Sequence, residues 1–243
     1  MIRKLMMGAT VAAVLFGSGV AYADPAAAVA DASRPDADKD RDAARKPAEM
    51  LTFSHIKDGD TVLELLPGGG YFTRLLSKDV GPSGHLYAAV PDAMSRDASP
   101  AATLIAKEPG YGNITVIPIQ PLPDLPPLDA IWTSQNYHDL HLSRVHADMA
   151  SVDKGFYAAL KPGGVVIIID HAAIAGAPVA ETADNLHRID PAVVKAEMTA
   201  AGFILDGESD ALWNPNDPHT DNVFAPTIRG KTDQFALRFK KPK

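Results

Sequence analysis

The chain has 243 residues, no cysteine and a formal net charge of −7, and 46% of its residues are hydrophobic. An acidic surface repels phosphate backbones, so this charge argues against nucleic acid as a partner. The lack of cysteine excludes disulfides, thiol nucleophiles and cysteine-bound metals, and stability must therefore come from a packed core.

The first 23 residues have the pattern of a secretory signal peptide. Arg3 and Lys4 precede an apolar run, and Ala21-Tyr22-Ala23 matches the small-x-small site that signal peptidase cuts. The run is short for a membrane span of about 20 residues, which argues against a permanent anchor. We therefore expect an exported protein, periplasmic or secreted, with no stable membrane insertion. Its mature chain would begin near Asp24, and the loss of two basic residues would change the net charge from −7 to −9.

Residues 24–44 consist mostly of alanine, aspartate, arginine, lysine and proline, with almost no large apolar side chain. Such a segment cannot bury enough surface to offset the entropy lost on ordering, so we expect a disordered linker here. The remaining residues, 45–243, number about 200, which suits a single α/β domain.

Hydrophobic periodicity divides this domain into alternating elements. In chain order it predicts a helix at residues 45–56, a strand at 61–66, a helix at 71–78, a strand at 85–90, a helix at 101–107, strands at 114–119 and 128–133, a helix at 142–160, a strand at 165–170, a helix at 191–201, and closing strands at 203–209 and 234–240. The run 165–170 is almost purely apolar, which is typical of a central parallel strand buried on both faces.

This alternation predicts an open, doubly wound sheet in three α/β/α layers. In such sheets ligands bind beyond the carboxyl ends of the strands, near the point where the strand order reverses. The turn at residues 67–70 (PGGG) lies at that end of the first strand. Glycine permits positive φ and lets a ligand approach the backbone, and the following helix offers free N–H groups. We therefore expect a site for a nucleotide-like molecule.

Two motifs, residues 62–70 (VLELLPGGG) and 160–164 (LKPGG), resemble those of class I S-adenosylmethionine-dependent methyltransferases. The resemblance covers about residues 45–242. It implies a Rossmann-like, mostly parallel sheet of seven strands with an antiparallel last strand, S-adenosylmethionine as cofactor, and no general need for a metal. Residues 134–141, 187–188 and 232–235 further resemble a group of predicted exported bacterial methyltransferases.

By this resemblance the cofactor would be held by the first strand's acid, the glycine turn, the helix start, the end of the second strand and the segment after the fourth: Glu64, Pro67, Gly68, Gly69, Gly70, Tyr71, Asp92 and Asn136. Two positions depart from the family pattern. Leu66 stands where the family has glycine. Val90 stands where the family has an acid that binds the ribose hydroxyls, and Asp92 lies two residues beyond it.

Residues 137–141 (YHDLH) follow the fourth strand, where this fold places groups that face the substrate. Histidine titrates near neutral pH and a carboxylate can orient it. We therefore expect His138 to act as a general base, with Asp139 as its orienter or a substrate contact, and Tyr137 as a third catalytic candidate. In the alternative interpretation, Tyr137 and His138 pack against the cofactor, while Asp139 and His141 cap the next helix.

Four further side chains are candidate substrate contacts: His141, His171, His187 and Arg188. Arg188 could clamp a carboxylate or pair with Asp190. Three of the histidines, 138, 141 and 187, could also bind a first-row metal with Asp139 or Asp190, but their spacing is loose and we expect no metal. The length of the connection at residues 213–233 suggests a lid or an oligomer contact, for example in a homodimer.

Serine hydrolase chemistry has little support, because the sequence contains no G-x-S-x-G elbow. We expect an exported S-adenosylmethionine-dependent methyltransferase that acts on an oxygen or nitrogen of a small molecule. The alternative is a binding or metal-handling protein that keeps the fold but no longer uses S-adenosylmethionine. Leu66, Val90 and the export signal motivate that alternative.

Overall fold

The structure is a computed structural model that describes residues 24–91, 101–120 and 123–243. Seven strands form one sheet in the order β3-β2-β1-β4-β5-β7-β6. Their bounds are β1 Thr61–Leu65, β2 His85–Val90, β3 Ile114–Pro118, β4 Leu128–Ser134, β5 Leu160–His171, β6 Ile204–Ser209 and β7 Gln234–Lys240. The pairs from β3 to β5 are parallel, and β7 runs antiparallel to β5 and β6. The predicted mostly parallel sheet with an antiparallel last strand is therefore confirmed.

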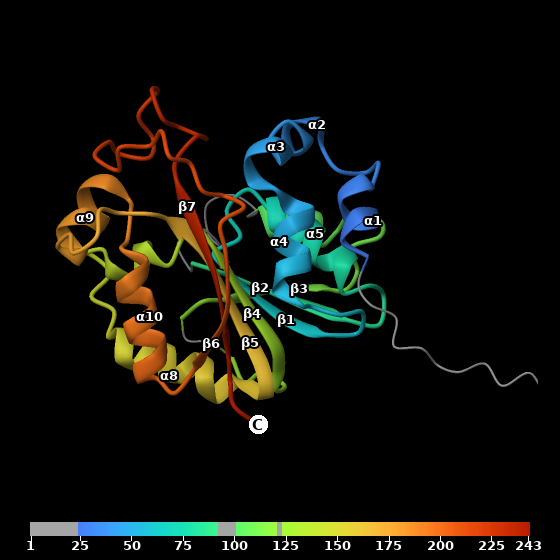
Figure 1. Cartoon of the computed structure of the whole chain (residues 1–243). Coiled ribbons are helices and arrows are strands. Elements are labelled where there is room, and N and C mark those ends of the chain that lie inside the picture. Colours follow the sequence, from blue (N-terminus) through green and yellow to red (C-terminus); the bar gives the residue numbers. More distant parts are fainter. Residues whose placement is uncertain (1–23, 92–100, 121–122) are drawn as a thin grey trace, which may run out of the picture.

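Helices cover both faces of the sheet and complete the three predicted layers (Figure 1). On one face lie α4 Pro47–Ser54 and α5 Tyr71–Asp79, and on the other lie α8 Met149–Ala159 and α10 Pro191–Ala200. The remaining elements of this part of the chain are α7 Ala101–Ile105, the 3₁₀ helix η1 His138–His141 and α9 Val179–Leu186. No helix in the described part of the chain combines the length and the apolar character needed to cross a bilayer.

The central strands supply the core of both faces, because successive side chains of a strand point to opposite sides. One cluster joins strand residues to α5: Val62, Trp132, Ile167, Phe72 and Leu75. The other joins their neighbours in the strands to α8 and α10: Leu63, Ile131, Ile168, Phe156 and Val194. Burial on both faces explains why the central strands are so apolar in sequence.

Residues 24–44 are ordered, whereas the sequence predicts a disordered linker. They form α1 Pro25–Ala30 and α2 Asp36–Lys39 and begin α3 Asp42–Arg45. The side chain of Asp24 accepts a hydrogen bond from Ala27 N and caps α1, which packs against α4 and α5. The prediction of a linker is therefore wrong for this segment.

Charged side chains help to hold these helices, in addition to the apolar contact of Ala28 with the core. Arg34 is 2% exposed, and its guanidinium donates to both carboxylate oxygens of Asp42, at 2.9 and 2.6 Å. The Tyr71 hydroxyl donates to the same carboxylate at 2.6 Å. Three guanidinium groups lie 4.7 to 5.6 Å from the centroid of the Tyr71 ring: those of Arg34, Arg41 and Arg45. A composition-based prediction misses this order because it weighs apolar surface and not paired charges or cation–π contacts.

Two element boundaries also differ from the predicted ones. The helix predicted from residue 142 begins only at Met149. Ser143 N donates instead to the Asp184 carboxylate of α9 at 2.9 Å, and His146 takes a left-handed φ of 53°. Strand β5 begins at Leu160 rather than at residue 165. Its pairing with β4 shifts register after Leu160, so residues 161–164 have no paired residue in β4.

Asp79, the last residue of α5, is 2% exposed, and neither carboxylate oxygen has a hydrogen-bond partner among the described residues. Burial raises the pKa of Asp79 to about 7, and a negative charge at a helix C-terminus is itself unfavourable. The folded protein thus keeps a proton that the unfolded chain releases near the ordinary pKa of 3.8. Because the folded state binds more protons, stability falls as the pH rises from about 4 to 7.

We expect Asp79→Asn to relieve this loss of stability. The gain in the free energy of unfolding over the wild type should be larger at pH 8 than at pH 5 by roughly 2 kcal/mol, since one pKa unit corresponds to about 1.4 kcal/mol. Urea unfolding at both pH values measures the gain, with Asp210→Asn at an exposed site as the control. A gain that is equal at the two pH values would show that Asp79 titrates as an ordinary carboxyl group.

Candidate functional site

The strand order reverses between β1 and β4, so the segments after these two strands diverge and leave a crevice at the carboxyl end of the sheet. A cavity of about 410 Å³ lies there, within the usual range for small-molecule sites. Its walls come from the turn after β1, the region of α3, the segment after β4, and residues near the ends of β5 and α9.

Leu66 adopts a φ of 52°, the left-handed conformation that glycine favours, at the position where the resembling family has glycine. Its N–H donates to the Ala89 carbonyl of β2 at 2.9 Å, and its carbonyl accepts from Asn136 Nδ2 at 3.0 Å. These bonds hold a backbone conformation that costs on the order of 1–3 kcal/mol in a residue other than glycine. Leu66 is among the residues that line the cavity.

The three glycines of the turn have different roles. Gly68 has a φ of 55° and lines the cavity, as does Gly69, and a Cβ at either position would meet no atom within 4 Å. Gly70 is the N-cap residue of α5, with a φ of 82°. A Cβ there would lie 2.2 Å from Ile105 Cδ1. Gly70 does not line the cavity, so its absent side chain serves packing and not the expected ligand contact.

Glu64, near the end of β1, is a buried acid in the cavity wall. It is 3% exposed, and its Oε2 has no hydrogen-bond partner among the described residues. Burial raises the pKa of Glu64 to about 8. A buried polar atom without a partner needs an explanation, and a cationic ligand group would supply one.

Two arginines from the N-terminal helices also line the cavity. Arg41 is exposed, while Arg45 is half-buried and donates to the Gln135 side chain. Burial lowers the pKa of Arg45 to about 10, so it remains protonated near neutral pH. The sequence does not single out either arginine, because this part of the chain has the composition of a linker and then the pattern of a helix start.

Asn136 joins the two segments that frame the crevice. Its Nδ2 donates to the Leu66 carbonyl at 3.0 Å and to the Ser134 carbonyl at 2.7 Å. Asn136 lines the cavity, as predicted for a cofactor-binding residue, but its amide nitrogen is already engaged in joining the end of β1 to the end of β4.

His138 is held by Asp170, at the end of β5, and not by the neighbouring Asp139. His138 Nδ1 lies 2.7 Å from Asp170 Oδ1, and His138 N donates to Asp170 Oδ2 at 2.8 Å. Burial lowers the pKa of His138, but the Asp170 carboxylate more than offsets this, so the net pKa is raised. The structure thus corrects the predicted orienter from Asp139 to Asp170.

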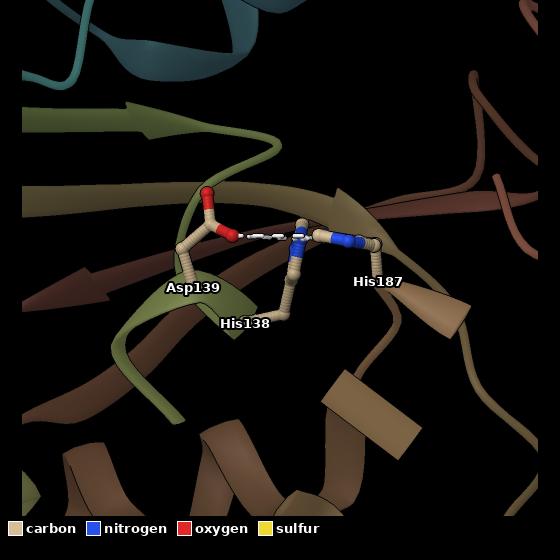
Figure 2. Close-up of side chains that lie close together, drawn as sticks. All are labelled: His138, Asp139 and His187. Atoms are coloured by element: carbon tan, nitrogen blue, oxygen red, sulfur yellow. Dashed lines mark hydrogen bonds and ion pairs between the residues drawn. The ribbon is translucent and has the colours of Figure 1, made fainter. Parts of the chain in front are cut away.

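Asp139 and His187 lie near the other nitrogen of the His138 ring (Figure 2). His138 Nε2 is 3.4 Å from Asp139 Oδ1 and 3.3 Å from His187 Nδ1. His187 Nδ1 is 3.7 Å from the same Asp139 oxygen. All three side chains line the cavity, and they form a group of atoms close enough to share a metal ion.

His171 also lines the cavity, as predicted for a substrate contact. Its Nδ1 lies 2.7 Å from Thr232 Oγ1, and burial lowers its pKa to about 4. The imidazole is therefore neutral near pH 7, and it adds a polar but uncharged group to the wall.

Tyr137 and His141 do not line the cavity. Tyr137 is fully buried, and its hydroxyl oxygen lies within hydrogen-bond distance of the carboxyl groups of Asp153, at 3.1 Å, and Glu197, at 2.9 Å. His141 Nε2 lies 3.2 Å from the same Glu197 carboxylate. Both residues belong to a polar cluster between η1, α8 and α10. The structure therefore does not support the predicted catalytic role of Tyr137 or the substrate contact of His141.

Arg188 is fully buried and anchors the long connection between β6 and β7. Its guanidinium donates to Asp217 at 2.8 and 3.1 Å and to two backbone carbonyl groups. It is therefore not free to clamp a substrate. Asp190, considered as its partner, instead caps α10 by accepting from Ala192 N at 2.8 Å.

The anchored connection brings Val223 and Phe224 to the cavity. Phe224 is 58% exposed, and its ring centroid lies 4.9 Å from that of His187. Figure 1 shows this connection at the same end of the sheet as α3. The connection thus contributes to the cavity wall, and no sequence signal distinguishes Phe224 from its neighbours.

Val90 ends β2 and is 2% exposed, and its carbonyl accepts from Ile119 N at 2.8 Å. The strand thus ends in an apolar residue where the resembling family has an acid. Asp92, which the sequence predicts as the substitute, lies outside the described residues.

No family model matches the chain. A curated relative, the protein-L-isoaspartate O-methyltransferase of Ignicoccus hospitalis, is 29% identical over 126 residues, which are 50% of this chain and 52% of the relative. The chain therefore matches about half the length of that protein.

Solved structures match nearly the whole chain. A SAM-dependent methyltransferase from Aquifex aeolicus has a TM-score of 0.60 at 21% identity, covering 89% of this chain and 98% of its own. The putative methyltransferase of Haloferax volcanii, solved with a methyltransferase activator, has a TM-score of 0.58 at 17% identity, covering 86% and 92%. A putative sarcosine dimethylglycine methyltransferase from Galdieria sulphuraria has a TM-score of 0.54 at 16% identity, covering 85% and 86%. The chain thus has the Rossmann-like fold of the class I methyltransferases.

Proposed function

We propose that the protein is an exported methyltransferase that uses S-adenosylmethionine and methylates an oxygen or nitrogen of a small molecule. The observation that carries the proposal is the make-up of one cavity. The turn after β1 lines it, and so does His138, whose ring is hydrogen-bonded to Asp170. A donor pocket and a proton-accepting group thus share one space. The fold and the curated relative, an O-methyltransferase by name, support the same class of reaction.

Three features of the cavity fit S-adenosylmethionine, which carries a carboxylate, an ammonium and a sulfonium group. Arg41 and Arg45 offer guanidinium groups to the carboxylate. Glu64 has a buried oxygen with no partner in the described part of the chain, and a cationic group would satisfy it. Gly68 and Gly69 leave their backbone open to a ligand. These residues, with Pro67 and Tyr71 beside them, are the ones that would hold the cofactor.

S-adenosylmethionine supplies, when bound, an electrophilic methyl group on sulfur. The cavity walls align the acceptor for an in-line displacement. Asp170 keeps the proton on His138 Nδ1, which leaves Nε2 to accept a hydrogen bond or a proton from the acceptor. Phe224, from the anchored connection, covers part of the cavity that His138 lines.

Leu66, Val90 and the export signal motivate the alternative of a fold that no longer uses the cofactor. Leu66 takes a left-handed backbone conformation, which glycine favours, and it lines a cavity of about 410 Å³. The departure in sequence therefore leaves the shape of the pocket in place, and this alternative is not favoured.

Export is proposed from the sequence of residues 1–23, and one structural fact supports the cleavage point. Asp24 is the N-cap residue of α1, and its side chain accepts a hydrogen bond from Ala27 N at 3.0 Å. Cleavage after Ala23 leaves this cap on the mature chain, and a cap is worth about 1 kcal/mol to a helix.

We expect Gly69→Leu to abolish cofactor binding while preserving the fold, because the side chain meets no protein atom near its Cβ but enters the cavity. Calorimetry on residues 24–243 should give a micromolar Kd for S-adenosylmethionine and S-adenosylhomocysteine in the wild type. The variant should bind at least ~100-fold more weakly, a loss of about 2.7 kcal/mol. Gly112→Leu, at an equally unobstructed but distant glycine, is the control. If the wild type binds neither compound, the proposed function is contradicted. If Gly69→Leu binds them as tightly as the wild type does, the ligand binds elsewhere.

We expect His138→Ala to reduce turnover by roughly 10²–10⁴-fold, the usual contribution of a positioned acid–base group. The Kd for S-adenosylmethionine should change far less, because His138 belongs to the acceptor's side of the cavity. Turnover is followed as S-adenosylhomocysteine formed with a panel of hydroxyl and amine acceptors, and His146→Ala, at an exposed histidine, is the control. Losses of equal size in turnover and in cofactor affinity would refute this division of roles.

We expect the full-length chain, expressed in a Gram-negative host, to be recovered from the periplasm with Asp24 as its first residue. Intact-mass spectrometry of the periplasmic fraction measures this. Replacing Ala23 by leucine should leave the uncleaved precursor, because the peptidase requires a small residue there. Full-length protein that stays in the cytoplasm would contradict the proposal of export without affecting that of methyl transfer.

A further inference from the structure

Three atoms of ligand type meet in the wall of the cavity. His138 and Asp139 belong to η1, and His187 follows the end of α9, so two segments far apart in the sequence build the cluster (Figure 2). The separations of His138 Nε2, Asp139 Oδ1 and His187 Nδ1 are 3.3, 3.4 and 3.7 Å. The cluster differs from the metal ligands considered from the sequence, because His141 and Asp190 have partners elsewhere.

A metal ion fits the centre of this triangle. The circle through three atoms with these separations has a radius of about 2.0 Å, which is the length of a zinc–nitrogen or zinc–oxygen bond. With bonds of about 2.1 Å the ion lies slightly out of the plane, and the angles between its ligands are roughly 105–125°, close to tetrahedral. A fourth position then remains for a ligand from the cavity that all three residues line.

The same separations are long for hydrogen bonds. The two contacts of His138 Nε2, at 3.3 and 3.4 Å, exceed the usual range of about 2.7–3.2 Å. On the opposite side of the ring, the bond from Nδ1 to Asp170 has an ordinary length of 2.7 Å. The three facing atoms are thus spaced widely for hydrogen bonds and at distances that suit ligands around a shared ion.

Neighbouring residues hold both rings in place. Asp170 accepts from His138 Nδ1 and so fixes the tautomer that presents the Nε2 lone pair, a carboxylate partner that metal-bound histidines commonly have. His187 is the C-cap of α9 with a φ of 55°, and its N–H donates to the Ala183 carbonyl at 3.1 Å. Its ring packs edge-on against Phe224. These contacts fix the two rings so that the three facing atoms converge beside the cavity.

We infer that His138, Asp139 and His187 bind a divalent transition-metal ion, with zinc as the ion that fits best. Two imidazoles and one carboxylate suit first-row metals, whereas calcium and magnesium prefer oxygen ligands. Three protein ligands with an open fourth position are typical of a zinc site that takes part in chemistry, while structural zinc sites are closed by four.

The role of the ion rests on the proposed function. The ion binds the hydroxyl oxygen of the acceptor at the open position and lowers its pKa, so that the proton leaves to water. The oxygen then attacks the methyl carbon. The new oxygen–carbon bond forms as the carbon–sulfur bond breaks, and the electron pair of that bond stays on sulfur, which becomes neutral. With the ion bound, His138 acts as a ligand in place of a base, and the acceptor is an oxygen compound.

Zinc binding by the mature chain, residues 24–243, tests the site directly. Protein freed of metal with a chelator is titrated with zinc chloride in a calorimeter, and the wild type should bind one equivalent with a submicromolar Kd. Asp139→Asn and His187→Gln should each raise the Kd at least ~100-fold, and Asp170→Asn roughly 10–100-fold through the orientation of His138. His146→Gln, at an exposed histidine outside the cluster, should match the wild type.

Thermal unfolding of the metal-free variants establishes that each one folds, and Asp139→Asn is the least demanding because that side chain is 32% exposed and keeps its shape in the variant. X-ray absorption at the zinc edge should show two imidazole ligands and oxygen. An inability of the wild type to bind zinc would overturn the inference, as would a Kd that His187→Gln and Asp139→Asn leave unchanged.

Gly69→Leu separates this inference from the proposed function. Its side chain would block the cofactor pocket and does not belong to the cluster, so its zinc affinity should equal that of the wild type. Zinc binding without any S-adenosylmethionine binding would support the metal site and refute methyl transfer. Methyl transfer that continues unchanged after complete metal removal would overturn the role of the ion.

Discussion

The buried carboxylate of Asp170 is the constraint on which the rest of the site depends. It lies at 0% exposure near the end of β5 and accepts three hydrogen bonds of 2.7 to 2.8 Å, two from His138 and one from the backbone of His171. Burial raises its pKa, but the nearby His138 lowers it more, so the carboxylate stays ionised. Breaking such a buried pair costs about 3–5 kcal/mol. The segment after β4 is therefore fixed to the end of β5, and the other side of the His138 ring is presented to the cavity.

The cavity itself joins two differently built walls. One wall consists of the turn after β1 together with Arg41 and Arg45. The charges of this wall are complementary to those of a zwitterionic ligand. The other wall is the histidine and carboxylate cluster, held from behind by Asp170 and covered by Phe224. Asn136 ties the first wall to the second, because its amide donates both to Leu66 and to Ser134. The hydrogen bond from Asn136 to the Leu66 carbonyl helps to stabilise the left-handed backbone conformation of Leu66.

The strands could be predicted from sequence because each is an apolar run bounded by turn residues, and β7 begins and ends where its pattern does. The location of the site followed from the same pattern, since ligands bind where the strand order reverses. The partners within the site did not follow. Asp139 is next to His138 in the chain, but Asp170 is next to it in space, because β4 and β5 pair in parallel. The burial of Arg188 against Asp217 and the order of residues 24–44 likewise depend on charge pairs between distant segments, which no local pattern records.

Residues that line the cavity lie as far apart in the chain as Arg41 and Phe224. Contacts between such distant positions form only after the intervening chain has condensed, because closing a long loop is entropically unfavourable. A partly folded intermediate therefore presents no complete pocket, and a molecule that occupies the pocket recognises only the finished native state. Occupancy then adds its binding free energy to the stability of the whole domain at once, instead of reinforcing one local region.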